Sequence, residues 1–437
     1  MKRISFATLG CKTNQFESAA MAEAARREGY RVVAAGESAD ICVINTCTVT
    51  ARTDAESRRL IRRALRKNPA ARIVVTGCYA QIAADEIRAM PGVSLVIGNT
   101  EKRELVALLR QPGDEQRVKV ADISQVREIG PLILETFAEH TRAFLQVQNG
   151  CDARCSYCII PHVRGPSRSV HLGDALEGIR TFARRGFREV VLTGIHLGAY
   201  GLDLSPPSSL LDLVSIVERE NIIPRLRLGS IEPTEIPDQL ISLMASGNSI
   251  CPHLHIPLQN GDDGVLAVMN RPYATAMFRQ LVEKLAAAVP GICIGTDIIA
   301  GFPGETEEAF ERGYRFLESL PFAYFHVFPF SVRQGTPAAT MTDQVPGQAI
   351  RRRAEALRNL STRKKRAYFE AFLGREVQVL LQEKRKGKNC VGLSRNYMPV
   401  SIADCDAPVN TEVIVRVTGV EGDLVRAALC SPFSFLT

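Results

Sequence analysis

The chain has 437 residues, of which 46% are hydrophobic and 23% are charged, and its formal net charge is +7. This composition excludes an intrinsically disordered chain, and the length predicts about three domains. No apolar run approaches the roughly 18 residues that span a bilayer, and the N-terminus is too short and strand-like for a signal peptide. We therefore expect no membrane partner and a cytoplasmic location, where cysteines more often bind metal than form disulfides.

The first domain, residues 1–112, is predicted to be a small open α/β fold with a mostly parallel sheet. Its apolar strands are expected at 4–9, 41–45, 73–76 and 95–97, and its helices at 14–28, 53–67 and 81–90. Continuous rather than alternating apolar strands indicate a sheet covered on both faces. Residues 113–138 carry turn and charge signals and are predicted to be a linker with one short strand.

The second domain, residues 139–370, repeats the strand and helix alternation six times. Its strands are expected at 144–149, 189–193, 225–230, 253–259, 293–300 and 324–330. Six units predict an incomplete parallel (β/α)6 barrel with its site at the carboxyl ends of the strands, by analogy with complete barrels. Residues 371–437 change to short alternating strands at 376–381, 390–393, 412–417 and 423–428, which favour a small antiparallel β-barrel.

Three cysteines follow the first strand of the predicted (β/α)6 barrel with the spacing C-x₃-C-x₂-C: Cys151, Cys155 and Cys158. A 4Fe-4S cluster is normally held by four cysteines, so three thiolates would leave one iron open to bind another molecule. The competing interpretation is structural zinc, because His162 follows Cys158 after three residues and could complete a Cys₃His site. The local spacing alone leaves both open.

A further set of three cysteines lies in the first domain. Cys11, Cys47 and Cys78 each follow a predicted strand, whereas Cys42 lies inside one and is expected to be a core residue. The carboxyl ends of parallel strands share one edge of a sheet. The three strand-end thiols are therefore predicted to meet in space as a second three-ligand metal centre.

The motifs around these six cysteines resemble those of one enzyme family. Leu-Gly-Cys-Lys-Thr-Asn (9–14), Asn-Thr-Cys-Thr-Val (45–49), Thr-Gly-Cys-Tyr-Ala-Gln (76–81) and Cys-Asp-Ala-Arg-Cys-Ser-Tyr-Cys (151–158) are similar to those of the radical S-adenosylmethionine (SAM) methylthiotransferases. Segments 192–201, 253–261 and 326–338 are most similar to the MtaB type. Departures are small: Asn260 stands where Ser is common, and Phe330 where Tyr is common.

This resemblance implies an auxiliary-cluster domain, a radical-SAM barrel and a C-terminal TRAM-like domain. It implies two 4Fe-4S clusters, one binding SAM and one serving as sulfur donor, and methylthiolation of N6-threonylcarbamoyladenosine beside the anticodon of tRNA at the expense of two SAM. Other members act on isopentenyl-adenosine in tRNA or on an aspartate of a ribosomal protein. A different class, a non-catalytic RNA-binding protein with two zinc sites, also stays open.

SAM contacts are expected from polar and aromatic residues near the strand ends. Tyr157 would pack against the adenine, and Gly194 would let the methionine part approach the backbone. Four polar residues could bind the ribose and amino group: Ser230, Glu232, Gln259 and Asp297. Core packing, a turn or local salt bridges would explain each of them as well.

Arg333 is the expected partner of the threonyl carboxylate, because arginine binds carboxylates in bidentate fashion. The alternative is a scaffold salt bridge.

Basic segments at 58–67, 351–366 and 383–388 suit RNA phosphates, although exposed helix faces are often basic without a partner. The expected partners are the anticodon stem-loop of tRNA, an electron donor such as flavodoxin or ferredoxin, and a sulfur source.

Overall fold

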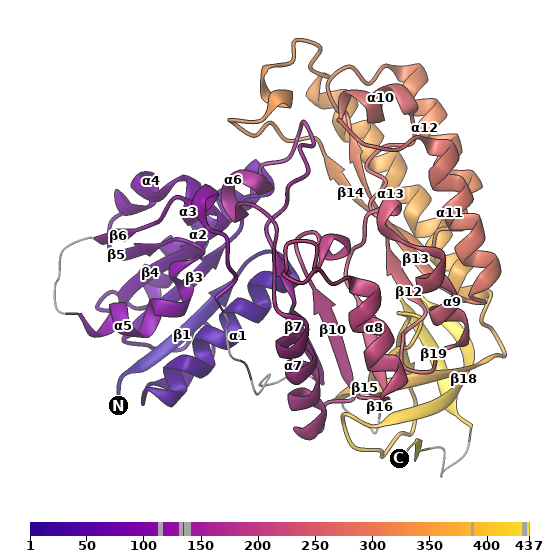
Figure 1. The fold of residues 1–437 in the computed structure, drawn as a ribbon, viewed down its shortest axis with the longest axis horizontal. Coiled ribbons are helices and arrows are strands. Elements are labelled where there is room, and N and C mark those ends of the chain that lie inside the picture. The colour runs from indigo at the N-terminus through magenta and orange to yellow at the C-terminus, as the bar shows by residue number, and fades with distance from the viewer. Residues whose placement is uncertain (112–116, 131–133, 135–140, 386–388, 431–434, 437) are drawn as a thin grey trace.

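The structure, a computed structural model, describes residues 1–437 except 112–116, 131–133, 135–140, 386–388, 431–434 and 437. Three units are visible in Figure 1: an N-terminal α/β domain, a central half-barrel, and a small β-barrel at the base of the half-barrel. The basic turn expected at 383–388 falls largely outside the described residues.

The N-terminal domain is a six-stranded sheet in which every pairing is parallel, in the order β2-β1-β3-β4-β5-β6. Its strands are β1 (Arg3–Thr8), β2 (Arg31–Val33), β3 (Ile41–Thr46), β4 (Arg72–Gly77), β5 (Val93–Ile97) and β6 (Arg117–Lys119). Its helices are α1 (Lys12–Arg27), α2 (Ala51–Lys67), α3 (Cys78–Ile82), α4 (Ala84–Arg88) and α5 (Leu105–Arg110), with a 3-10 turn, η1, at Glu101–Glu104.

Both faces of this sheet are covered, as continuous apolar strands require. Ile61 of α2 and Tyr79 of α3 pack with Ile44 on one face, whereas Met21 of α1 and Leu108 of α5 pack on the other. The predicted helix at 81–90 is interrupted at Ala83, between α3 and α4. The short strand expected beyond residue 112 is β6, which pairs with β5 and so extends the sheet.

The central unit is the predicted incomplete barrel, with six parallel strands in two three-stranded sheets, β11-β10-β7 and β12-β13-β14. Isolated parallel bridges, Leu226 to Ile250 and Ser230 to His255, connect the two sheets. Among the described residues β7 and β14 do not pair, which leaves the barrel open between them. The strands are β7 (Arg142–Gln146), β10 (Glu189–Thr193), β11 (Arg225–Leu228), β12 (His253–His255), β13 (Cys293–Ala300) and β14 (Tyr324–Pro329).

Helices form the outer layer of the half-barrel (Figure 1). They are α7 (Leu172–Arg184), α8 (Leu210–Arg219), α9 (Asp238–Ser246), α10 (Asp263–Val268), α11 (Thr275–Ala288), α12 (Glu307–Ser319) and α13 (Gly347–Glu370). The loops contain α6 (Ile160–Arg164), the strand pair β8 (Gln148–Asn149) and β9 (Arg168–Ser169), and short 3-10 turns, η2 (Ile123–Gln125), η3 (Leu197–Ala199), η4 (Pro233–Glu235) and η5 (Pro337–Thr340).

The C-terminal unit is a small β-barrel closed by pairing of β15 with β18. Its strands are β15 (Glu376–Arg385), β16 (Asn389–Ser394), β17 (Pro399–Ile402), β18 (Glu412–Glu421), β19 (Leu424–Leu429) and β20 (Phe435–Leu436). The pairing of β17 with β19 is parallel and the others are antiparallel. Strand β17, which was not expected, starts at a proline and spans four residues, too short for a clear alternation.

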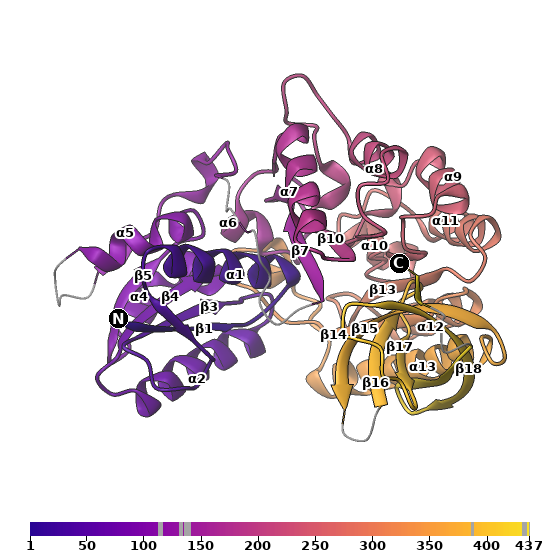
Figure 2. The same ribbon diagram turned by 90° about the horizontal axis from the view of Figure 1, so that it is seen from below.

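The small β-barrel packs against the half-barrel (Figure 2), and buried charges join the two units. Glu189 of β10 binds the guanidinium groups of Arg225 and Arg227, at 2.7 Å and 2.8 Å, and all three side chains are fully buried. Arg225 also reaches Glu412 of β18, at 2.6 Å, and the carbonyl of Leu393. The C-terminal β-barrel therefore supplies a carboxylate and a carbonyl that bind a buried arginine of the half-barrel.

Among the described residues, no helix combines the length and the hydropathy that a membrane span needs.

A charge substitution in β18 tests this junction. Glu412→Ala is expected to destabilise the protein by about 3 kcal/mol, the lower end of the cost of breaking a buried pair, because Glu189 still holds Arg225. Glu421→Ala on the same strand breaks an exposed pair with Arg426 and should change stability by about 0–1 kcal/mol. Thermal unfolding of the two variants measures the difference, and equal melting shifts would contradict a buried ionic junction.

Candidate functional site

The first cysteine set lies at the carboxyl edge of three neighbouring strands. Cys11 follows β1 and precedes α1, Cys47 follows β3, and Cys78 begins α3 directly after β4. Strands β1, β3 and β4 are adjacent in the sheet, so the topology places the three cysteines at one edge of the sheet. That their thiols share one metal centre stays a prediction.

The backbone segments that carry these cysteines approach one another closely. Gly10 has φ +101°, and a Cβ there would lie 3.0 Å from Cys47 Sγ. Gly77 has φ +99°, and a Cβ there would lie 2.3 Å from the carbonyl oxygen of Thr46. Burial, followed by the neighbouring thiols of Cys78 and Cys11, raises the pKa of Cys47 to about 11. Crowded thiols of this kind deprotonate readily only when a metal compensates their charge.

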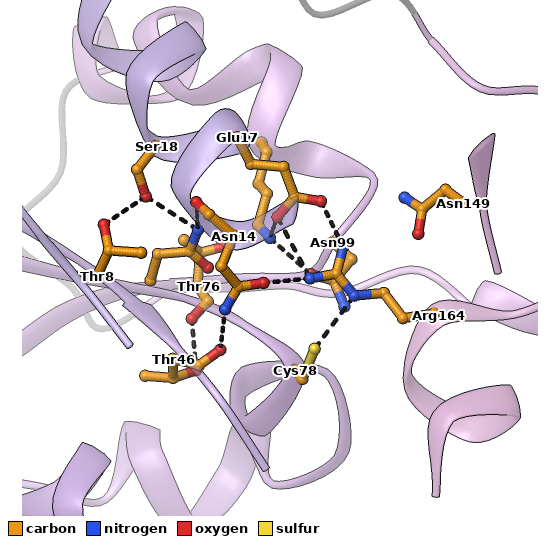
Figure 3. Close-up of polar contacts among 12 residues, drawn as sticks. Thr8, Asn14, Glu17, Ser18, Thr46, Thr76, Cys78, Asn99, Asn149 and Arg164 are labelled. Atoms are coloured by element: carbon orange, nitrogen blue, oxygen red, sulfur yellow. Dashed lines mark hydrogen bonds and ion pairs between the residues drawn. The ribbon is translucent and has the colours of Figure 1, made fainter. Parts of the chain in front are cut away.

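A buried arginine from the half-barrel lies against this thiol group (Figure 3). Arg164, the last residue of α6, is 0% exposed, and its Nε donates to Cys78 Sγ at 3.1 Å. Its terminal nitrogens donate to Glu17 and Asn14. Asn14 in turn donates to the carbonyls of Leu9 and Thr46, which precede Cys11 and Cys47.

The charges around Arg164 do not balance. Glu17 is the carboxylate partner of both Arg164 and Lys102, and all three side chains are buried. Burial would raise the pKa of Glu17, but the two cations outweigh it and hold that pKa below its ordinary value. Two cations against one carboxylate leave a positive charge beside Cys78, which suits an anionic thiolate-bound metal centre.

The second cysteine set occupies the loop between β8 and α6. The Cys158 amide donates to the Cys155 carbonyl, and the Cys151 amide to the Gly165 carbonyl, each at 3.0 Å. Burial, with the nearby thiols of Cys155 and Cys151, raises the pKa of Cys158 to about 12. The thiols of Cys155 and Cys151 thus lie near that of Cys158. Ile159 and α6, which ends at Arg164, follow Cys158 directly.

Cys151 and Cys155 each have an ionisable side chain next to the thiol. Arg271 donates to Cys155 Sγ at 3.1 Å and pairs with Glu232. His196 Nδ1 lies 3.5 Å from Cys151 Sγ, and its Nε2 lies 2.7 Å from Glu235. Burial opposes protonation of His196, but hydrogen bonds to Cys151 and Glu235 raise its pKa to about 10.

The residues expected to bind SAM are divided between two cavities. One, of about 180 Å³, is lined by Tyr157, Gln259 and Asp297 together with Cys158. It also reaches Val49 and Thr50, which follow Cys47. The other, of about 290 Å³, contains Glu232 beside Cys155, His196 and Arg271. The first cavity thus lies between the two cysteine sets.

Gln259 holds a left-handed backbone, with φ +71°. Non-glycine residues in this region carry strain, which concentrates at functional sites. Its amide donates to the Asp297 carbonyl and its own carbonyl accepts from Ile299, each at 2.8 Å, so β13 holds the conformation. The strained backbone fixes the start of the Gln259 side chain at the wall of the 180 Å³ cavity.

The remaining SAM candidates have different surroundings. A Cβ on Gly194 would lie 2.9 Å from Gln148 Oε1, so a side chain rather than open space faces that glycine. Ser230 is exposed and forms the bridge between β11 and β12. Tyr157 packs edge-on against Phe302 at 6.4 Å while lining the 180 Å³ cavity.

Arg333 connects the half-barrel to the N-terminal domain. Its Nη1 pairs with Asp54 at 2.7 Å and its Nη2 donates to Thr48 Oγ1 at 2.6 Å. Its Nε is buried without a partner. The scaffold contact weighed as an alternative is therefore present, and one N–H remains unsatisfied.

His255, Asp297 and His326 form a further polar group inside the half-barrel, with ligand atoms within 4.8 Å of one another. Asp297 Oδ1 lies 2.9 Å from His255 Nε2 and 3.1 Å from His326 Nδ1. Burial would raise the pKa of Asp297, but the hydrogen bonds from both histidines outweigh it and lower that pKa. The trio could hold a metal ion, and without one it is a closed hydrogen-bond network.

Arg164, Arg271 and His196 were not singled out in the sequence. Each touches a cysteine only through tertiary contacts, across 86, 116 and 45 residues. Their local sequence carries no spacing signal, apart from the position of Arg164 soon after Cys158.

Comparison with known proteins assigns the two larger units separately. Residues 3–98 match the family described as "Uncharacterized protein family UPF0004". Residues 145–317 match the radical SAM superfamily. Each match contains one of the two cysteine sets.

Relatives match over nearly the full chain. The threonylcarbamoyladenosine tRNA methylthiotransferase MtaB of Bacillus subtilis is 37% identical, covering 98% of this chain and 97% of that protein. The protein of the same name from Aquifex aeolicus is 36% identical, covering 91% and 96%. The solved structure of the radical SAM methyltransferase TsrM from Kitasatospora setae has a TM-score of 0.55 at 16% identity, covering 77% of each chain, and supports the fold.

The charge imbalance around Arg164 predicts a coupled mutational effect. Glu17→Gln leaves two buried cations unpaired and should cost about 3–5 kcal/mol. Adding Lys102→Met to Glu17→Gln removes one of those cations, so the double variant should lose less than the sum of the two single effects. Thermal unfolding of the single and double variants gives the coupling. Additive losses would show that these side chains do not share one network.

Proposed function

The chain belongs to the radical-SAM tRNA methylthiotransferases of the MtaB type, and we propose that its substrate is N6-threonylcarbamoyladenosine beside the anticodon of tRNA. The reaction replaces the hydrogen on C2 of the adenine by a methylthio group and uses two SAM. The observation that carries this proposal is the pair of three-cysteine sets on either side of one cavity, which fits a reaction that needs both a radical and a sulfur donor at one carbon.

Cys151, Cys155 and Cys158 would hold the 4Fe-4S cluster that the radical SAM superfamily implies. Bound there, the cluster would supply an electron to SAM and so the radical chemistry that an unactivated C–H bond requires. Around it, Arg271 places a guanidinium 3.1 Å from Cys155 Sγ. Hydrogen bonds to ligand sulfurs tune cluster potential, so Arg271 and His196 are suited to that role.

We assign Cys11, Cys47 and Cys78 to a second 4Fe-4S cluster that serves as the sulfur donor. Supporting this are the position of all three cysteines at one edge of the sheet and the buried guanidinium of Arg164 at Cys78. Asn14, which hydrogen-bonds the loops before Cys11 and Cys47, fixes the distance between them. Arg164 would hold this site against the loop that carries Cys158.

For SAM we propose contacts from Tyr157, Gln259 and Asp297, which share the 180 Å³ cavity with Cys158. Glu232 is suited to an ammonium group beside Cys155, where it is half-buried and already pairs with Arg271. Gly194 and Ser230 remain predictions. Phe328 and Phe330 add apolar walls to this cavity.

The substrate is tRNA, and two basic helices are the proposed phosphate contacts. Helix α2 is strongly basic, and only Ser57 and Ile61 along it are buried. Helix α13 carries a second basic set next to the small β-barrel. We further propose a cytoplasmic location, where tRNA is modified, an electron donor of the flavodoxin or ferredoxin kind, and a separate sulfur source.

Replacing single cysteines separates the two proposed clusters. Cys155→Ala should abolish reductive SAM cleavage, because two thiolates will not hold the open cluster. Cys47→Ala should retain cleavage of SAM to 5′-deoxyadenosine and lose sulfur insertion. Its iron content should fall to about half of the roughly eight irons expected for two clusters. Chromatography of 5′-deoxyadenosine with iron analysis checks both outcomes.

His162→Ala is the matched control, on the helix that follows Cys158. It should keep its iron, whereas a Cys₃His zinc site would lose its metal. Equal loss of 5′-deoxyadenosine in Cys155→Ala and Cys47→Ala would contradict the proposed division.

The substrate assignment is tested with tRNA that carries or lacks the threonylcarbamoyl group. Wild type should methylthiolate the modified tRNA efficiently and discriminate against unmodified or isopentenylated tRNA, as nucleoside mass spectrometry would reveal. If Arg333 Nε binds the carboxylate, Arg333→Ala should raise KM for modified tRNA while sparing SAM cleavage without tRNA. A buried donor left unpaired costs about 1–3 kcal/mol, which corresponds to an affinity lower by about 5- to 150-fold.

Asp54→Asn is the control for Arg333, because it breaks the same ion pair without removing the guanidinium. A carboxylate-binding Arg333 predicts a larger KM effect for Arg333→Ala than for Asp54→Asn. Identical effects would reduce Arg333 to a scaffold residue, and efficient methylthiolation of isopentenylated tRNA by wild type would overturn the substrate assignment.

A further inference from the structure

An aromatic stripe follows the inward face of β14, the outer strand of the half-barrel. Tyr324, His326 and Phe328 alternate along the strand, while Phe325 and Val327 between them pack into the core. The His326 side chain is 57% exposed and Phe328 is 38% exposed. Large exposed aromatic surface on an edge strand is unusual and often marks a binding site.

A residue of the C-terminal β-barrel extends this stripe at its lower end. Tyr397, in the turn between β16 and β17, lies 6.2 Å from Tyr324 with the rings inclined by 28°. Tyr324 lies 5.2 Å from His326. Asp297 holds the His326 ring through Nδ1 at 3.1 Å, so the exposed ring has a fixed orientation before any ligand arrives.

The lower part of the stripe lines a cavity of about 550 Å³, a volume typical of ligand sites. Its walls come from β14, from α13 and from the C-terminal β-barrel; they include Tyr324, His326, Tyr397, Arg358, Lys365 and Tyr368. Arg358 is exposed and makes no ion pair among the described residues. Lys365 pairs with Asp423, which is 82% exposed.

The upper end of the same stripe reaches the cavity between the cysteine sets. Phe328 lines that 180 Å³ cavity with Cys158 and Asp297, and it lies two residues, or about 6.6 Å, from His326 along the strand. A row of aromatic side chains along β14 therefore leads from the proposed reaction site to a larger cavity that the reaction does not use.

We propose that the 550 Å³ cavity binds an unpaired base of the RNA loop, next to the nucleotide that enters the 180 Å³ cavity. This inference rests on the proposed function. Aromatic rings stack on any base, and cations beside them neutralise phosphates. Bases in single-stranded loops are the ones that can be splayed onto such rings. His326 would stack on the base, and Arg358 would contact its phosphate.

A peptide strand added to the free edge of β14 fits this cavity less well. The Phe325 amide donates to Ser361 Oγ at 2.8 Å, and Ser361 Oγ donates to the Phe325 carbonyl at 3.1 Å. The serine therefore occupies the backbone groups that an added strand would need. The aromatic and cationic side chains remain available, and they favour a nucleotide.

A double-mutant cycle, with one change in the RNA and one in the protein, tests the inference. The probes are anticodon stem-loop hairpins with an intact or abasic nucleotide on either side of the target adenosine, and anisotropy measures their binding to the anaerobically purified full-length protein. In wild type, one abasic position should weaken binding by about 5- to 100-fold. In His326→Ala the same lesion should cost less than about 2-fold, because its stacking partner is gone.

His326→Ala also removes the hydrogen bond from His326 to Asp297. Two variants of α13 therefore provide a test that leaves this hydrogen bond intact. Arg358→Ala should weaken intact and abasic hairpins alike and reduce the slope of log K against log salt by about one. Arg363→Ala is the matched control on the same helix, where it pairs with Glu318 away from the cavity. It should leave the abasic effect unchanged.

An abasic effect that is absent in wild type, or equal in wild type and His326→Ala, overturns the inference. Nucleoside analysis of the same preparations keeps the two proposals apart. Methylthiolation without RNA–protein coupling would refute only the stacking site. Coupling without methylthiolation would refute the proposed function and leave an RNA-binding cavity.

Discussion

The contact between Arg164 and the N-terminal domain is the constraint on which the rest of the site depends. Arg164 ends the helix that follows the second cysteine set, yet its guanidinium donates to Cys78 of the first set and to Glu17 and Asn14. A buried ion pair has fixed geometry and a high cost of breaking. It therefore ties the positions of the two cysteine sets together, a requirement for any reaction in which both act on one carbon.

A second buried ionic group plays the corresponding part at the other end of the half-barrel. Glu189 lies between Arg225 and Arg227, and Glu412 of the C-terminal β-barrel completes the group. An interface made only of apolar surfaces would allow the two units to slide against each other, whereas buried ion pairs fix one arrangement. The turn with Tyr397 is thereby placed at the base of the half-barrel, where Tyr397 stacks on His253 at 4.1 Å. The C-terminal β-barrel thus supplies part of the wall of the 550 Å³ cavity.

The opening between β7 and β14 explains why the exposed aromatic residues gather where they do. A complete barrel would bury both faces of β14 and pair its free edge. In this half-barrel the inward face of β14 meets a cavity, so Tyr324, His326 and Phe328 stay accessible.

The sequence by itself determined the three-part architecture, the six barrel strands and the two cysteine sets. Hydrophobic periodicity and the position of a cysteine after a strand are local features of the sequence. In a parallel sheet the carboxyl ends of the strands lie at one edge, so Cys11, Cys47 and Cys78 could be grouped without coordinates. Tertiary structure alone decided the charged partners: Arg164 beside Cys78, Arg271 beside Cys155, and Arg333 bound to Asp54. Such contacts join residues far apart in the chain, and their geometry follows from how whole domains pack, which no local pattern records.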